Sequence, residues 1–273
     1  MFIPFMRRVA AAVLAAAGLA GVLLCSCGRG TSEQILLVGS TSVQPFAEKL
    51  AHAFHAAHAK IRVDVQGGGS AAGIRLVRDG AAQVGASSRH LSAAEQEGLS
   101  TFLIARDGIA VIVHRSNPVE DLAPEQIRAI FGGEITDWAS LGGTSGPVHA
   151  VTREDGSGTR GAFEELVMGE ETIDARCLVG SSNGTVREMV SGDPGAIGYI
   201  SLGLVDERIK AVRIAGHSAT HEEIVSGGYP FVRPFLFLTK GEPAGHVKIF
   251  LDYVLSPDGQ AVLEKAGLAR AQP

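Results

Sequence analysis

Apolar runs that fit buried strands alternate along this chain with stretches that place apolar residues at helical spacing. Strand patterns occur at residues 35–38, 61–65, 84–86, 148–151 and 195–200, with a strand pair expected at 103–113 and a proline-containing extended stretch at 229–238. Helical patterns follow several of these strands, and two more occupy residues 245–255 and 257–266. Because strands that alternate with helices form sheets covered by helices, the pattern predicts an α/β fold.

Four of the strand patterns end in turns rich in glycine and hydroxyl side chains. These turns read GSTS at 39–42, QGGGS at 66–70, SSR at 87–89 and REDGSGT at 153–159. Serine and threonine are ordinary helix caps, but three hydroxyls in a row at 40–42 are more than one cap needs. Ligands of open α/β sheets bind at the carboxyl ends of the strands, so we expect these turns to surround one ligand.

The turn at 153–159 has the chemistry of an anion site. The first N–H groups of a helix lack partners, and the helix dipole adds about half a positive charge there. Ser157 and Thr159 add hydroxyl donors, and Arg153 can offer a two-pronged guanidinium to an oxyanion. The glycines at 156, 158 and 161 also fit G-x-G-x-x-G, which leaves a dinucleotide turn or an ordinary helix cap as alternatives. Charged residues before the first glycine count against the dinucleotide.

The first 27 residues have the composition of an export signal. Two arginines at 7 and 8 precede an apolar run at 9–24, and LCSC follows at 24–27. Leu24, three positions before Cys27, and the serine directly before that cysteine resemble a lipobox, so we expect lipidation at Cys27; Cys25 is the weaker candidate. The run is short for a membrane-spanning helix, and an uncleaved anchor is the alternative. We expect the folded part to lie outside the cytoplasm, in the periplasm or at the cell surface.

Charge and the residues capable of metal or redox chemistry limit the possible functions. Without the leader's two arginines, 24 − 2 = 22 basic residues face 29 acidic ones, a net charge of about −7, which disfavours nucleic acid as a partner. With Cys27 lipidated, Cys177 has no partner, so we expect a buried thiol and no disulfide. His52, His55 and His58 recur every third residue. A shared metal is the alternative to an exposed polar helix edge, and we expect no metal and no cofactor.

Six motifs together resemble the PstS family, the phosphate-binding proteins of bacterial ABC importers. They read VGSTSVQPF, QGGGSAAG, VGASSR, IFGGEITDW, REDGSGTR and GAIGY, and the resemblance covers nearly all of the chain after the leader. The resemblance implies an α/β fold of the two-lobe, type II periplasmic-binding-protein kind, with two crossing strands between the lobes and the ligand in the cleft. On that basis we expect lobe 1 at residues 28–113 plus 232–273 and lobe 2 at residues 114–231.

The resemblance also assigns residues to a phosphate site. The implied contacts are Thr41, Ser42, Ser70, Ser88, Arg153, Ser157, Gly158 and Thr159. Asp155 is expected to hold Arg153 in place, and Arg89 to reach the anion or the mouth of the cleft. Several family members have an aspartate at the position of Ser88, where the carboxylate accepts a hydrogen bond from protonated phosphate. A serine, which both donates and accepts, leaves the preference for phosphate over sulfate open.

Together these features predict a non-catalytic, monomeric, lipid-tethered receptor that binds phosphate and delivers it to an ABC permease and its ATPase. One alternative is a receptor for sulfate, molybdate or tungstate on the same fold. Another is an exported hydrolase with Ser70 or Ser157 as its nucleophile. Neither serine lies in G-x-S-x-G, and the sequence places no His/Asp pair to activate one, so we expect no enzyme activity.

Overall fold

The computed structural model describes residues 33–271, in which ten strands form one continuous mixed sheet. Its first half holds β1 (Glu33–Gly39), β2 (Ile61–Gly67) and β3 (Val84–Ser87), its second half holds β6 (His149–Arg153), β7 (Leu178–Gly180) and β8 (Ala196–Ser201), and β4 (Leu99–His114) and β11 (Val232–Lys240) lie between them. The order is β2-β1-β3-β11-β4-β8-β6-β7, and β9 (Ile209–Ala211) and β12 (Ala269–Arg270) also pair with β4. A separate pair joins β5 (Asp121–Leu122) to β10 (Arg213–Ile214).

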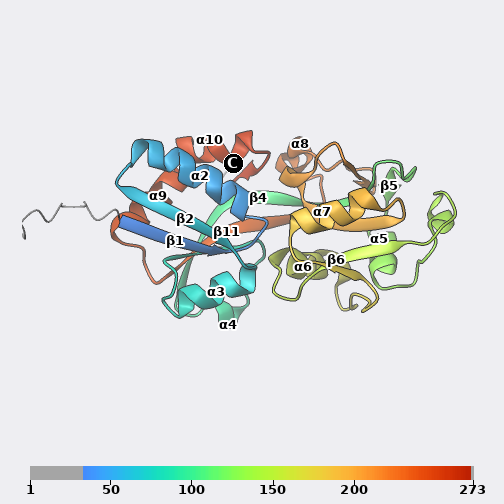
Figure 1. Ribbon diagram of the computed structural model, residues 1–273, viewed down its shortest axis with the longest axis horizontal. Coiled ribbons are helices and arrows are strands. Elements are labelled where there is room, and N and C mark those ends of the chain that lie inside the picture. The colour runs from blue at the N-terminus through green and yellow to red at the C-terminus, as the bar shows by residue number, and fades with distance from the viewer. Residues whose placement is uncertain (1–32, 272–273) are drawn as a thin grey trace, which may run out of the picture. The chain divides into compact units, whose positions relative to one another are not determined.

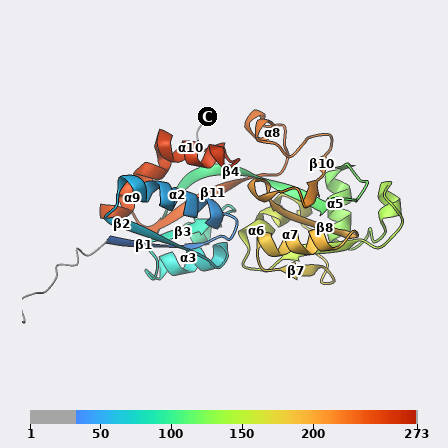
Figure 2. The ribbon, with the colours of Figure 1, turned by 45° about the horizontal axis from the view of Figure 1, so that its top comes forward.

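Helices flank both halves of the sheet (Figures 1 and 2). They are α2 (Gln44–Ala57), α3 (Ser70–Arg78), α4 (Ala93–Gln96), α5 (Pro124–Phe131), α6 (Gly158–Phe163), α7 (Asn183–Gly192), α8 (His221–Ser226), α9 (Gly245–Leu255) and α10 (Pro257–Lys265), with 3₁₀ turns η1 (Trp138–Leu141) and η3 (Leu202–Leu204) and a π-helical turn η2 (Glu164–Met168). The predicted α/β fold is confirmed. Within residues 33–271 no helix is both long enough and apolar enough to span a bilayer. The expected leader at residues 1–27, with Cys25 and Cys27, lies outside the described residues.

Two long strands, β4 and β11, join the halves, and in both views they run from one half into the other (Figures 1 and 2). The expected strand pair at 103–113 is wrong, because these residues belong to the single sixteen-residue strand β4. Asp107-Gly108 has the sequence of a hairpin turn. Here both residues stay extended, because β11 pairs with them through Val232 and Arg233.

Each half has its own main hydrophobic core. Phe46, Phe54, Phe235, Phe237 and Phe250 belong to the first core, and Phe131, Trp138, Phe163 and Tyr199 belong to the second. Along β4 the packing changes from the first core at Ala105 to the second at Ile109, a few residues before the predicted lobe boundary at 113. The polar residues Arg106 and Asp107 interrupt the apolar run of β4 between the two cores, so the change of core falls at this break and not at the end of the run. The exact lobe boundaries stay a prediction.

Candidate functional site

The carboxyl ends of the parallel strands bring the predicted hydroxyl turns together from both halves of the sheet. Ser42, after β1, and Thr159, in the first turn of α6, have hydroxyl oxygens 2.6 Å apart. Ser88, after β3, donates its backbone N–H to Ser70 Oγ at 3.1 Å, and its own Oγ accepts from Ser40 Oγ at 2.8 Å. These side chains are all buried. Hydroxyls from four separate turns therefore share one enclosed region.

Gly158 shows how closely the turns approach. A Cβ placed on this residue would lie 2.0 Å from Ser70 Oγ and 2.6 Å from Ser88 Oγ. Real Cβ atoms do not come that close to another heavy atom, so any larger residue would push the first and second halves of the site apart. Glycine at this position lets the backbone of α6 meet the hydroxyls of the first half directly.

Some hydroxyls of the turns cap helices and others do not. Ser40 Oγ accepts the N–H groups of Ser42 and Val43 at 3.2 and 3.4 Å, close to the start of α2. Ser157 Oγ accepts the N–H groups of Thr159 and Arg160 at 3.2 and 3.3 Å, so this oxygen acts as the ordinary helix cap that was the alternative. The hydroxyl hydrogen of Ser157 can still be donated to a ligand.

The hydroxyls of Thr41, Ser42 and Ser70 do not cap a helix. Gly69, and not Ser70, is the cap of α3. Thr41 and Ser42 bond to the second half of the molecule and cap nothing. This supports the interpretation that three consecutive hydroxyls after β1 are more than a cap requires.

Arg153 ends β6, and its side chain is 1% exposed. Its Nε bonds to Gly180 O at 3.0 Å, and its Nη2 donates to Thr41 Oγ1 at 3.0 Å. Nε and Nη2 also hold Glu154 through both carboxylate oxygens at 2.9 Å. Nη1 is buried and has no hydrogen-bond partner among residues 33–271. The guanidinium is therefore fixed in place on one side and offers two N–H donors on the other.

The expectation that Asp155 supports Arg153 is wrong. Glu154 holds the guanidinium, whereas Asp155 is 93% exposed and pairs with Arg160 at 2.6 Å. The chain turns sharply after β6, with Ser157 N–H bonded to Glu154 O at 3.0 Å, and this turn directs consecutive side chains differently. Sequence adjacency alone does not decide which carboxylate points back.

The structure also does not bring the guanidinium of Arg89 to the hydroxyl cluster. Both of its terminal nitrogens bind Glu95 at 2.7 Å, in a two-pronged pair. This carboxylate is available because Glu95 and Ser92 form the capping box of α4. The aliphatic part of Arg89 lies against Gly161 of α6, where a Cβ would come within 2.7 Å of Arg89 Cδ. The expected anion contact of Arg89 is replaced by packing against the second half.

Sequence reasoning missed several buried polar residues beside the site. Asn183, the first residue of α7, donates to Ser42 Oγ at 2.9 Å and accepts the N–H of Ser201 at 3.1 Å. Arg233 Nε and Nη2 bind Asp107 Oδ2 at 3.0 and 2.8 Å, with both side chains almost fully buried. Burial raises the pKa of Asp107 and lowers the pKa of Arg233, because a charge in a water-free interior is costly. A strand interior or a helix start carries no local signal for such partners.

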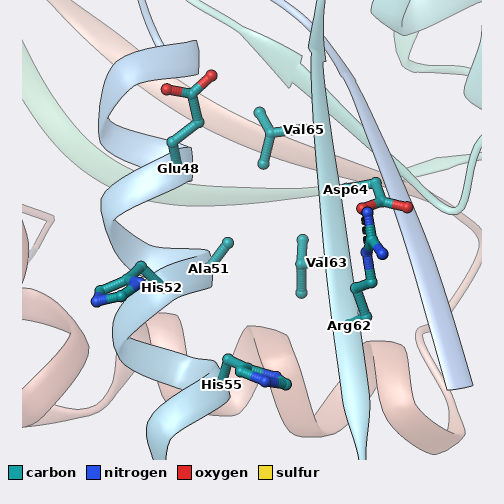
Figure 3. Close-up of a pocket in the computed structure, with 8 residues that line it drawn as sticks. All are labelled: Glu48, Ala51, His52, His55, Arg62, Val63, Asp64 and Val65. Carbon is teal, nitrogen blue, oxygen red and sulfur yellow. Dashed lines mark hydrogen bonds and ion pairs between the residues drawn. The ribbon is translucent and has the colours of Figure 1, made fainter. Parts of the chain in front are cut away.

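The histidine stripe on α2 does not form a metal site. Among the described residues, no group of three or more His, Cys, Asp or Glu side chains could hold a metal ion. A cavity of about 440 Å³ between α2 and β2 is lined by His52 and His55, together with Glu48 and the ion pair between Arg62 and Asp64. Figure 3 shows the two imidazoles and the carboxylates separated around this cavity instead of converging. His52 and His55 are exposed, as the alternative of an exposed polar helix edge expects, whereas His58 follows the end of α2 and stacks on Phe54 with ring centres 4.4 Å apart.

The residues considered as nucleophiles are not placed for catalysis. Ser70 Oγ and Ser157 Oγ accept backbone N–H groups, and among residues 33–271 neither oxygen is hydrogen-bonded to a histidine. Cys177 is half-buried, and burial raises the pKa of its thiol to about 11, so the thiol stays protonated at neutral pH. None of the three has an adjacent base that would activate it.

Comparisons with known proteins agree with this geometry. The model of the PBP superfamily domain matches residues 28–258. The phosphate-binding protein PstS of Bacillus subtilis is 33% identical over 235 residues, which cover 84% of this chain and 77% of that protein. A candidate phosphate ABC transporter substrate-binding protein from Clostridium perfringens, solved with bound phosphate, superposes with a TM-score of 0.84 at 38% identity over 87% of this chain and 99% of its own. An ABC-type phosphate transport receptor from Vibrio cholerae gives a TM-score of 0.73 at 36% identity over 86% and 99% of the two chains.

The two-halved sheet and the buried donors at its centre define a substrate-binding receptor of the PBP superfamily, with the two-lobe fold. Within that superfamily the chain belongs to the PstS family of phosphate-binding proteins. Proteins of this family are receptors and not enzymes, which agrees with the prediction of a non-catalytic receptor.

Proposed function

We propose that this protein binds inorganic phosphate outside the cytoplasmic membrane and delivers it to an ABC transporter permease. The residues proposed to contact the anion are Thr41, Ser42, Ser70, Ser88, Arg153, Ser157, Gly158 and Thr159. The first four come from lobe 1 and the others from lobe 2, so the anion would be held between the lobes. Binding would then stabilise the closed arrangement of the two lobes.

The observation that carries this proposal is the unpartnered Nη1 of Arg153. A buried N–H without an acceptor costs about 1–3 kcal/mol, so an acceptor bound at Nη1 would stabilise the structure. Nη2 of the same guanidinium reaches Thr41 in lobe 1, and the enclosed hydroxyls share this junction of the lobes. A tetrahedral oxyanion accepts from a guanidinium and from several hydroxyls at once.

The proposal is tested by a panel of oxyanions against the purified protein without its leader. Phosphate should raise the melting temperature, because a ligand that binds only the native state stabilises it by about 2.7 kcal/mol at a hundredfold excess over Kd. Calorimetry should give one phosphate site per chain. If no tetrahedral oxyanion changes the melting temperature and phosphate gives no binding heat, the receptor function is overturned.

One observation favours a second candidate, a receptor for sulfate, molybdate or tungstate. Two carboxylates connected to the hydroxyl cluster through hydrogen bonds, Glu154 and Asp107, are bound to Arg153 and Arg233. A proton on phosphate would therefore find hydroxyl oxygens, such as Ser88 Oγ, as acceptors. Competition between phosphate and sulfate at two pH values separates the candidates, since phosphate changes its protonation near neutral pH and sulfate does not.

Delivery and location complete the proposal. The relatives include an ABC-type phosphate transport receptor, which supports a permease with its ATPase as the partner complex. We propose that Cys27 carries the lipid that holds a monomeric receptor at the membrane surface. Metabolic labelling with a fatty acid would detect the lipid, and a Cys27→Ala variant should lose the label and be released from the membrane.

A further inference from the structure

A buried ion pair lies where the two crossing strands pass between the lobes. Arg233 of β11 and Asp107 of β4 are directly paired in the register of the two strands. Their side chains are 1% and 0% exposed, and the guanidinium also lies over the ring of Phe235 at 5.3 Å from its centre. The pair is therefore built into the only two long strands that connect the lobes within the described residues.

The ion pair is connected to both halves of the proposed anion site. On one side, Arg233 Nη1 donates to Ser88 O at 3.5 Å. On the other, Asp107 Oδ1 accepts from Ser201 Oγ at 2.8 Å, and the N–H of Ser201 binds Asn183. Asn183 in turn donates to Ser42 Oγ. A continuous path of buried hydrogen bonds thus runs from the Ser88 turn through the crossing strands and back to Ser42.

Stability alone gives a weak reason for this pair. Removing two charges from water costs about as much as their attraction returns, and apolar residues of similar volume often serve a fold equally well. The arrangement has a different benefit, because it fixes the Ser88 turn and the start of α7 relative to the same two strands. Arg233 carries no net charge to the site, since Asp107 neutralises it at close range.

We propose that Arg233 and Asp107 are positioning residues of the anion site, which hold Ser88 and, through Ser201 and Asn183, Ser42 at the geometry that binds the anion. This inference rests on the proposed function. The pair itself does not contact the anion. It acts as a second layer of hydrogen bonds behind the binding hydroxyls, in the way that outer partners orient the ligands of a metal.

The test separates positioning from stability with a double variant, Asp107→Leu with Arg233→Met. This change removes one charge of each sign, so the net charge stays the same, and it fills the space with apolar side chains. The free protein should melt close to the wild-type temperature or above it. Phosphate should nevertheless bind about 10- to 100-fold more weakly by calorimetry, as is typical when outer partners of a binding site are lost.

Gln260→Met is the matched control. Gln260 is also buried and bonds to Ile104 O and Val254 O, but none of its hydrogen bonds leads to the anion site. This variant should melt at a lower temperature and keep wild-type phosphate affinity. The single variant Arg233→Met, which leaves Asp107 unpaired, should lose both stability and affinity.

The outcomes distinguish the two proposals. If the wild-type protein itself gives no binding heat with phosphate, the proposed function fails and the positioning role fails with it. If the wild type binds phosphate and the double variant binds it equally well, only the positioning role is overturned. If the phosphate affinity of the double variant falls only in proportion to its melting temperature, Gln260→Met should show the same proportion. The pair then has a structural role, and the inference is again overturned.

Discussion

At the scale of single residues, Arg153 combines full burial with incomplete pairing. Its four hydrogen bonds, to Glu154, Gly180 and Thr41, fix the plane of the guanidinium before any ligand arrives. A prearranged donor loses little entropy when it binds, so more of the interaction energy contributes to affinity. The contact with Thr41 also joins the lobes, which couples the orientation of this arginine to their closure.

Arg153→Ala should weaken phosphate binding by about 2–5 kcal/mol, the usual loss when one partner of a buried charged contact is removed. Arg153→Lys should give an intermediate loss, because one ammonium cannot reproduce the planar fork. Calorimetry measures both. The control is Arg176→Ala, which removes an arginine whose side chain is 72% exposed and paired on the surface. A loss for Arg153→Ala no larger than for this control contradicts the role of Arg153.

The clustering of the hydroxyls was easier to predict from the sequence than the residues that support them. Thr41, Ser70 and Ser157 occupy strand ends, and topology brings all strand ends of this kind to one place. The supports depend on side-chain direction and on distant pairing, which no local pattern contains. Glu154, and not Asp155, holds Arg153, and the guanidinium of Arg89, expected at the anion or the mouth of the cleft, binds Glu95. Each arginine pairs with the carboxylate that the folded chain brings within reach.

At the scale of elements, helix starts and strand ends were predictable, whereas local irregularities were not. The helix expected at 245–255 is present with those bounds. Its apolar residues recur at helical spacing, and Pro257, the first residue of the next helix α10, marks where it ends. The helix after Ser157 carries Phe163, Leu166 and Val167 at the spacing of one face of a regular helix. It widens into the π-helical turn η2, which rotates the helix face and leaves Leu166 exposed. An extra residue in one turn has no signature in hydropathy.

The short helix α4 gives a pH-dependent prediction. Glu95 has a pKa lowered to about 2, first because Arg89 donates hydrogen bonds to it and then through the N–H of Ser92. A lowered pKa contributes stability above the unfolded value of 4.5, and this contribution is lost as the pH falls towards 2. The free energy of unfolding should therefore decrease over this window. Glu95→Gln should remove that part of the decrease.

Urea unfolding at several pH values between 5 and about 2 measures this effect, and carbon NMR of the Glu95 carboxyl gives its pKa directly. Arg89→Gln serves as the partner variant, because it removes the main cause of the lowered pKa while keeping the carboxylate. Glu95→Gln should lose all of this pH-dependent part of the stability, and Arg89→Gln most of it, because the N–H of Ser92 still bonds to the carboxylate in the second variant. A Glu95→Gln protein that keeps the full acid dependence of the wild type contradicts the assignment.

At the scale of the whole receptor, the lobes touch through backbone as well as side chains. Ala71 N–H in lobe 1 donates to Gly156 O in lobe 2 at 3.2 Å, beside the hydroxyl contacts of the site. Affinity for the anion depends on the fraction of molecules that can reach this closed arrangement. A change that obstructs closure should therefore weaken binding without touching any residue that holds the anion.

Gly69→Ala provides this obstruction. Gly69 has φ +89°, and a Cβ there would lie 2.7 Å from Gly156 O in the opposite lobe. If the collision raises the free energy of closure by about 1.4 kcal/mol, phosphate affinity should fall about tenfold.

Gly80→Ala is the matched control, because Gly80 has a similar φ of +76° but no atom within 4 Å of the added Cβ. Both variants place an alanine at positive φ, and the collision with the opposite lobe is specific to Gly69. Calorimetry gives the affinities, and small-angle scattering at saturating phosphate should show that Gly80→Ala contracts as the wild type does. Equal affinities for the two variants would show that the lobes bind the anion without the close approach at Gly156.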